Sequence, residues 1–201
     1  DGVTGAEVAA SIGPRLAKAA VAAKLDGAFV DLDMPIPFDG SFAVITDTTE
    51  EGRHVLRHSA AHVMAQAVLD LYPGAKFAIG PPITDGFYYD FAREEPFTPE
   101  DLKAIEKKMA HIVKQNRPIE KRLIPKAEAL ELFKKRGQTL KCELIREKAG
   151  DPVQCYTMGD FIDFCLGPHL ASTKEIKAFK LNPSPAAAYW KGKEGNPSMQ
   201  R

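Results

Sequence analysis

Residues 50–72 read EEGRHVLRHSAAHVMAQAVLDLY, and this stretch organises the chain. Its apolar residues recur at the spacing of an amphipathic helix: Leu56, Ala60, Val63, Met64, Ala67, Val68 and Leu71. At about 100° per residue, His58 and His62 share a second stripe, away from that apolar face. Two imidazoles among small and apolar neighbours are not an ordinary solvated face. We therefore expect this stripe to form one wall of a pocket.

The composition is that of a soluble globular protein. The 201 residues are 44% hydrophobic and 27% charged, which suits one large domain or a small domain plus a medium one. No apolar run approaches membrane-spanning length, and no signal-peptide pattern opens the sequence. The three cysteines show no paired pattern, which indicates reduced thiols and a cytoplasmic location.

The net charge is zero, but basic residues accumulate between residues 103 and 126. They are Lys103, Lys107, Lys108, Lys114, Arg117, Lys121, Arg122 and Lys126. Acidic residues are interleaved with them, so a solvated helix face and a phosphate-facing patch are both open interpretations.

Turn and cap signals divide the chain into a small unit, residues 1–47, and a larger one, residues 48–201. In the first unit, Thr4 begins a helix and Asp26-Gly27 marks a hairpin. In the second, helices begin near residues 50, 99 and 126, and strand-like runs cover 119–124, 139–145, 153–158, 176–181 and 186–191. Turns are too frequent for a doubly wound parallel sheet. We expect an α+β fold with helices packed on a mixed or antiparallel sheet.

A second motif, Cys165-Leu166-Gly167-Pro168-His169, carries another pair of side chains that can bind a metal or orient water, here on a loop. Cys165 and His169 are four residues apart, as are His58 and His62, but Gly167-Pro168 excludes a helix. Two histidines with a cysteine and a further histidine would suit a tetrahedral zinc ion. A metal-free cluster that orients water through its imidazoles is the alternative. Cys165 as a nucleophile is a third, although nothing marks its thiol as activated.

Asp163 and Lys141 are two further polar residues that can be read either as structural or as functional. Asp163 stands among apolar residues, and in an extended segment it would point to the same side as Cys165. It is either a buried cap or a group that recognises an ammonium or hydroxyl. Lys141 lies in an expected strand, where a lysine is ordinarily exposed.

Three blocks together resemble the editing domain of bacterial-type threonyl-tRNA synthetases. They are HSAAH at 58–62, AIGPPITDGFYYD at 78–90 and CLGPH at 165–169. The first block is shared with alanyl-type editing proteins, whereas GFYYD and the later AYW at 188–190 are more specific to the threonyl enzyme. Residues 1–47 resemble its β-grasp-like TGS module without the opening strand. The end of the chain resembles the segment leading into the catalytic domain, and no aminoacylation core is expected here.

The resemblance implies a proofreading hydrolase that deacylates mischarged seryl-tRNA(Thr). Serine lacks one methyl group of threonine, which supplies only about 1–3 kcal/mol of discrimination, so a second hydrolytic site is needed. Implied partners are the serine-bearing 3′ end of tRNA(Thr) and the rest of the synthetase, a homodimer when complete, with no membrane. A zinc-dependent deacylase of alanyl type and a non-catalytic binding module are the alternatives.

The resemblance also assigns roles by position. His58 and Lys141 would hold or activate the attacking water, and Asp163 would hold the seryl group. His62, Cys165 and His169 would complete the pocket, while Gly80 and Tyr89 would lie against the substrate or the terminal adenosine. No cofactor is implied. Zinc on His58, His62, Cys165 and His169 is the alternative, because the ligand types favour it.

Overall fold

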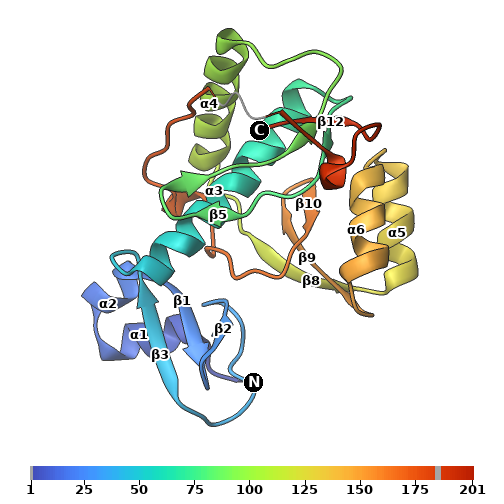
Figure 1. The fold of residues 1–201 in the computed structure, drawn as a ribbon. Coiled ribbons are helices and arrows are strands. Elements are labelled where there is room, and N and C mark those ends of the chain that lie inside the picture. The colour runs from blue at the N-terminus through green and yellow to red at the C-terminus, as the bar shows by residue number, and fades with distance from the viewer. Residues whose placement is uncertain (1, 184–186) are drawn as a thin grey trace.

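The structure is a computed structural model that describes residues 2–183 and 187–201. Helices pack on small sheets, and every strand pairing among the described residues is antiparallel (Figure 1). This arrangement confirms the α+β class. Within these residues, no helix combines the length and apolar character needed to cross a membrane.

The N-terminal part is a three-stranded sheet covered by two short helices. Its elements are α1 (Gly5–Ile12), α2 (Pro14–Ala19), β1 (Ala20–Leu25), β2 (Ala28–Val30) and β3 (Phe42–Thr46), with strand order β2-β1-β3. Thr4 and Glu7 form the expected capping box at α1. Asp26 and Gly27 turn the hairpin with φ of 48° and 81°. Helix α2 was not expected; Pro14 occupies its first turn, where a missing N–H costs nothing.

Helix α3 (Glu50–Leu71) runs from this sheet into the middle of the larger part (Figure 1). Every residue from Ser59 to Val68 is buried, which includes His62 and most of the apolar face, whereas His58 is half-buried. Near its start the helix meets the N-terminal sheet closely: a Cβ on Gly52 would lie 1.9 Å from the carbonyl oxygen of Thr46. Val21, Ala22 and Ile45 consequently belong to the same hydrophobic core as α3.

The larger part surrounds α3 with short sheets and three further helices. The helices are α4 (Pro99–Lys114), α5 (Lys126–Lys135) and α6 (Thr139–Lys148). One sheet has the order β10-β9-β8, from β8 (Glu120–Ile124), β9 (Val153–Met158) and β10 (Phe161–Phe164). A second, β11-β12-β7-β4, joins β4 (Lys76–Phe77), β7 (Phe91–Ala92), β11 (Ala187–Tyr189) and β12 (Ser198–Gln200). A hairpin pairs β5 (Pro82–Ile83) with β6 (Gly86–Phe87), and short 3₁₀ turns cover Thr173–Glu175 and Trp190–Gly192.

Three expectations for this part need correction. Residues 139–145 form the first turns of α6 rather than a strand, because Leu140 and Leu144 fit a period of two and a helical i, i+4 spacing equally well. Residues 176–181 are extended chain outside any sheet. The last expected strand, 186–191, is β11 only over Ala187–Tyr189, and Ala186 lies outside the described residues.

Candidate functional site

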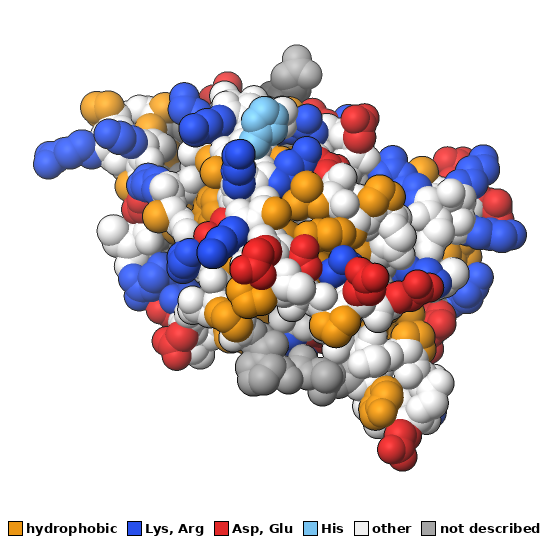
Figure 2. Space-filling view, turned by 90° about the horizontal axis from the view of Figure 1, so that it is seen from above, with side chains coloured by type: hydrophobic (Ala, Val, Ile, Leu, Met, Phe, Trp, Pro, Cys, Tyr) orange, Lys and Arg blue, Asp and Glu red, His pale blue; other side chains and the backbone are white. Residues whose placement is uncertain are grey.

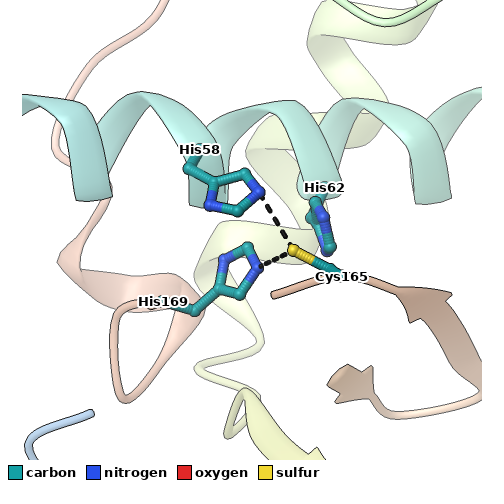
Figure 3. Close-up of side chains that lie close together, drawn as sticks. All are labelled: His58, His62, Cys165 and His169. Carbon is teal, nitrogen blue, oxygen red and sulfur yellow. Dashed lines mark hydrogen bonds between the residues drawn. The ribbon is translucent and has the colours of Figure 1, made fainter. Parts of the chain in front are cut away.

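The two motifs meet at one point in the fold. Helix α3 presents His58 and His62 from consecutive turns, while the loop after β10 carries Cys165 and His169 toward them (Figure 3). The sulfur of Cys165 lies 3.1 Å from Nε2 of His58 and 3.4 Å from Nε2 of His169. One ligand-type atom from each of the four residues lies within 4.8 Å of the others. The fold thus brings two motifs about a hundred residues apart in sequence into a single cluster.

A second group adjoins this cluster through His62. The Asp163 carboxylate lies 3.3 Å from Nε2 of His62 and accepts a 2.5 Å hydrogen bond from the Tyr89 hydroxyl. Lys141 Nζ forms a 2.5 Å ion pair with the same carboxylate and donates to the Tyr89 oxygen at 2.8 Å. Lys141, Asp163 and Tyr89 are each no more than 2% exposed. A buried ion pair of this kind needs such extra hydrogen bonds to offset its desolvation.

Lys141 corrects an expectation drawn from its position in sequence. It is buried on α6 rather than exposed on a strand, and its ammonium also lies 4.7 Å from the centre of the Phe77 ring. The helix places it on the face that packs inward with Leu144 and Ile145. A lone lysine among apolar residues gives no sequence signal of this burial.

The three imidazoles are held neutral by their surroundings. Burial, and then the charge of His54, lowers the pKa of His58 to about 4. Burial likewise moves the pKa values of His62 and His169 well below the ordinary value, with smaller effects of neighbouring histidines. Neutral imidazoles offer lone pairs that can accept hydrogen bonds from water at neutral pH.

Cys165 is not an activated nucleophile in this setting. Burial, reinforced by the nearby Asp163 charge, raises the pKa of its thiol to about 12. Reactive cysteines instead have a depressed pKa. The interpretation of Cys165 as the attacking group is therefore disfavoured.

Supporting contacts orient His169, and sequence reasoning missed them. Ser59 Oγ lies 3.0 Å from Nδ1 of His169 and accepts a hydrogen bond from the Leu170 backbone N–H. Asp31, directly after β2 in the N-terminal unit, accepts a hydrogen bond from the His169 backbone N–H. Ser59 lies inside the HSAAH motif and was open to detection, whereas nothing in the sequence links Asp31 to a residue so far along the chain.

Gly80 and Tyr89 lie together, but the glycine meets the tyrosine ring rather than open space. A Cβ on Gly80 would lie 2.1 Å from Cδ2 of Tyr89. Only glycine therefore lets Tyr89 reach Asp163 and Lys141. The structure accounts for Gly80 by this close packing.

The four ligand-type residues fit a zinc ion chemically. Tetrahedral zinc with histidine and cysteine ligands separates its donor atoms by about 3.3–3.6 Å, given metal–ligand bonds of about 2.0–2.3 Å. The 3.4 Å sulfur–nitrogen distance falls in this range and the 3.1 Å distance is slightly shorter, while the four ligand-type atoms all lie within 4.8 Å of one another. If a zinc ion is bound, His58, His62, Cys165 and His169 are the residues that hold it.

Other sequence candidates lie elsewhere. His111 is exposed on α4, where its Nε2 lies 3.0 Å from Gln115 Nε2. The basic residues from 103 to 126 are spread over α4, the connection after it, β8 and the start of α5, and α4 and β8 occupy different parts of the larger unit (Figure 1).

Comparison with known proteins gives relatives along the whole chain. Residues 153–201 match the family described as the threonyl and alanyl tRNA synthetase second additional domain. The threonine–tRNA ligase of Pelobacter propionicus is 52% identical over 200 residues, covering 100% of this chain and 31% of that protein. The ligases of Citrifermentans bemidjiense and an Azoarcus species are each 50% identical, over 97% and 99% of this chain. The chain spans less than a third of the length of these relatives. Along its whole length, the chain is therefore a homologue of threonine–tRNA ligases.

Proposed function

We propose that the chain is a proofreading hydrolase that deacylates seryl-tRNA(Thr). The observation that carries the proposal is the buried meeting of a lysine ammonium, an aspartate carboxylate and three neutral imidazoles beside Cys165. The matches to threonine–tRNA ligases and to their second additional domain support a proofreading role in general. Such a site needs both a water-orienting group and a group that stabilises negative charge.

His58 is the residue that would hold the attacking water. It is half-buried, whereas His62 and His169 are almost completely buried, so it is the most solvent-accessible of the three imidazoles. Its Nδ1 is buried and has no hydrogen-bond partner among the described residues. The Pro168 backbone lies near enough to raise the pKa of the ring, but this effect is smaller than the lowering by burial. Because its low pKa makes the ring a weak base, His58 serves mainly to orient water.

Hydrolysis adds the water oxygen to the ester carbonyl carbon and then breaks the carbon–oxygen bond to the ribose. The carbonyl oxygen becomes negative in the intermediate, and the leaving ribose oxygen takes up a proton. Lys141 is close enough to lower the pKa values of His58 and His62 by its charge. The same charge would stabilise the developing oxyanion in a site that excludes water. Serine and intact tRNA(Thr) are the products.

Asp163 would hold the seryl group through its ammonium. In the structure the carboxylate already contacts Lys141, Tyr89 and His62, so the substrate ammonium would share it. Asp163, His62 and His169 are each at most 3% exposed, so a seryl group beside them would be closely enclosed. We infer that threonine is rejected sterically, as an editing site requires.

The remaining partners belong to the same proposal. Residues 1–47 would be a TGS-like module and residues 48–201 the editing domain, with the rest of a homodimeric synthetase supplying most tRNA contacts. Figure 2 looks down on the end of the molecule where α4 stands, and Lys and Arg gather over the left part of that face. Lys103, Lys107 and Lys114 of α4 are exposed, and we propose that they face tRNA phosphates.

Deacylation of seryl-tRNA(Thr) and threonyl-tRNA(Thr) by the metal-stripped chain tests the proposal. We expect loss of serine only, abolished by His58→Ala and by Lys141→Ala. The matched controls are His111→Ala and Lys135→Ala, exposed residues of the same types, on α4 and α5, that should leave the rate unchanged. No hydrolysis of either ester by the folded chain would contradict the proposal and favour a binding module.

A zinc-dependent deacylase is the second candidate, because the four donor atoms fit that metal. Bound zinc would polarise a water molecule and lower its pKa, provided that the water replaces one of the four residues or adds a fifth ligand. Under this alternative, metal analysis of the purified chain finds about one zinc per chain. Chelation then removes activity, and added zinc restores it. Full activity after chelation, with no bound metal, would reject this candidate.

A further inference from the structure

Asp31 belongs to the N-terminal sheet unit, directly after β2, yet its carboxylate is buried beside the loop that carries Cys165 and His169. Only 6% of the residue is exposed. Oδ1 accepts a 3.0 Å hydrogen bond from the His169 backbone N–H, and Oδ2 accepts a 2.7 Å hydrogen bond from the Tyr156 hydroxyl. One side chain thus joins the loop to β9 across two parts of the molecule.

Tyr156 completes the support from the other side. Its ring packs edge-on against the His169 imidazole, with ring centres 4.5 Å apart. The loop passes close over the tyrosine oxygen, since a Cβ on Gly167 would lie 2.1 Å from it. A carboxylate accepts the two hydrogen bonds through its two oxygens, whereas an amide has one accepting oxygen and can keep only one of these contacts.

We propose that Asp31 is a positioning residue of the site. By holding the His169 backbone and the Tyr156 ring, it sets where the His169 imidazole lies relative to His58 and Cys165. The N-terminal unit is then part of the hydrolytic site and more than an attached module. The kinetic consequence rests on the proposed function, whereas the placement of the loop does not.

Asp31→Ala and Asp31→Asn test the proposal, with Asp47→Ala as the matched control. Asp47 also joins the two parts of the molecule, through a 2.7 Å ion pair with exposed Lys177, but it does not touch the site. Asp31→Ala leaves two buried donors unpaired, and we expect kcat for serine release to fall about tenfold or more with KM little changed. Asparagine keeps an oxygen for the His169 N–H and should restore most of kcat.

Three kinetic outcomes would overturn the proposal. They are a normal kcat in Asp31→Ala, a rise in KM alone, and a loss in Asp47→Ala as large as in Asp31→Ala. An Asp31→Asn variant as slow as Asp31→Ala would also overturn the assigned contact with the His169 N–H.

A second readout needs no activity and keeps the two proposals separable. In the native chain, iodoacetamide should alkylate Cys165 about tenfold faster in Asp31→Ala than in the wild type, because a loosened loop exposes the thiol. Buried Cys142 and Cys155 are internal controls for global unfolding and should keep their rates. Equal Cys165 rates in both proteins would refute the positioning role, even if serine is hydrolysed. If the wild type hydrolyses no ester but Cys165 behaves as expected, only the proposed function fails.

Discussion

Replacing Gly80 by alanine should damage the site through Tyr89, with no need for contact with substrate. The new Cβ would lie 2.1, 2.5 and 2.6 Å from three atoms of the Tyr89 ring. Ordinary carbon contacts are about 3.5–4.0 Å, so the ring has to retreat by more than about 1 Å. Tyr89 is 1% exposed and has no free space of its own. The displacement must therefore spread to its hydrogen-bonding partners.

Two costs contribute to the loss of stability. Overpacking a filled core costs about 1–3 kcal/mol. Weakening the Tyr89 hydroxyl contacts to buried Asp163 and Lys141 costs about 1–3 kcal/mol more. We expect the free energy of unfolding to fall by about 2–6 kcal/mol in total. A shift of about 1 Å in catalytic groups would also lower the deacylation rate about a hundredfold.

Urea unfolding followed by circular dichroism measures the first quantity, and a double-mutant cycle identifies its cause. In a Tyr89→Ala background the ring is gone, so Gly80→Ala should cost less than about 0.5 kcal/mol. Gly74→Ala is the matched control, since a Cβ there meets nothing within 4 Å. If Gly80→Ala costs the same with and without the Tyr89 ring, the steric reasoning is refuted.

Three further predictions concern charge and caps. Lys141→Met leaves the Asp163 carboxylate buried without its cation and should lower the free energy of unfolding, measured in urea, by about 3–5 kcal/mol. Adding Asp163→Asn should recover much of this loss, and no recovery would contradict the pairing. Because the pKa of folded His58 is about 4 and that of the unfolded residue about 6.5, only the unfolded state binds this proton between those values, so stability falls as the pH is lowered through that window. His58→Gln should reduce this slope by up to about 1.4 kcal/mol per pH unit, and an unchanged slope would contradict the low pKa. Thr98→Ala removes the hydroxyl that caps α4 and should cost about 1 kcal/mol, measured as a shift in the urea midpoint, whereas Thr98→Ser should not.

Local signals predicted much of the fold because they depend on neighbours in sequence. The capping box at Thr4, the hairpin at Asp26 and the proline start of α4 all appear in the structure. The strand expected at 139–145 is wrong because its apolar spacing satisfies two periods, and only packing against the rest of the protein selects the helix.

The sequence predicted that His58, His62, Cys165 and His169 would come together, because two motifs carry metal-ligand side chains at the same spacing. The burial of Lys141 was not, since it depends on which face of α6 turns inward and on the Asp163 carboxylate that neutralises it. Asp31 was equally hidden, because its partners are 125 and 138 residues away. Long-range contacts of single polar residues leave no periodic trace in a sequence.

The close contact at Gly52 limits how the two parts of the chain can diverge in evolution. The helix backbone there lies against the Thr46 carbonyl, and a Cβ would also approach Val21 to 3.1 Å. A contact made by backbone on both sides allows no compensating exchange of side chains. A different N-terminal unit grafted at this joint would have to reproduce the path of β1 and β3, whatever its sequence. We therefore expect α3 and the N-terminal sheet to be inherited together as one structural unit.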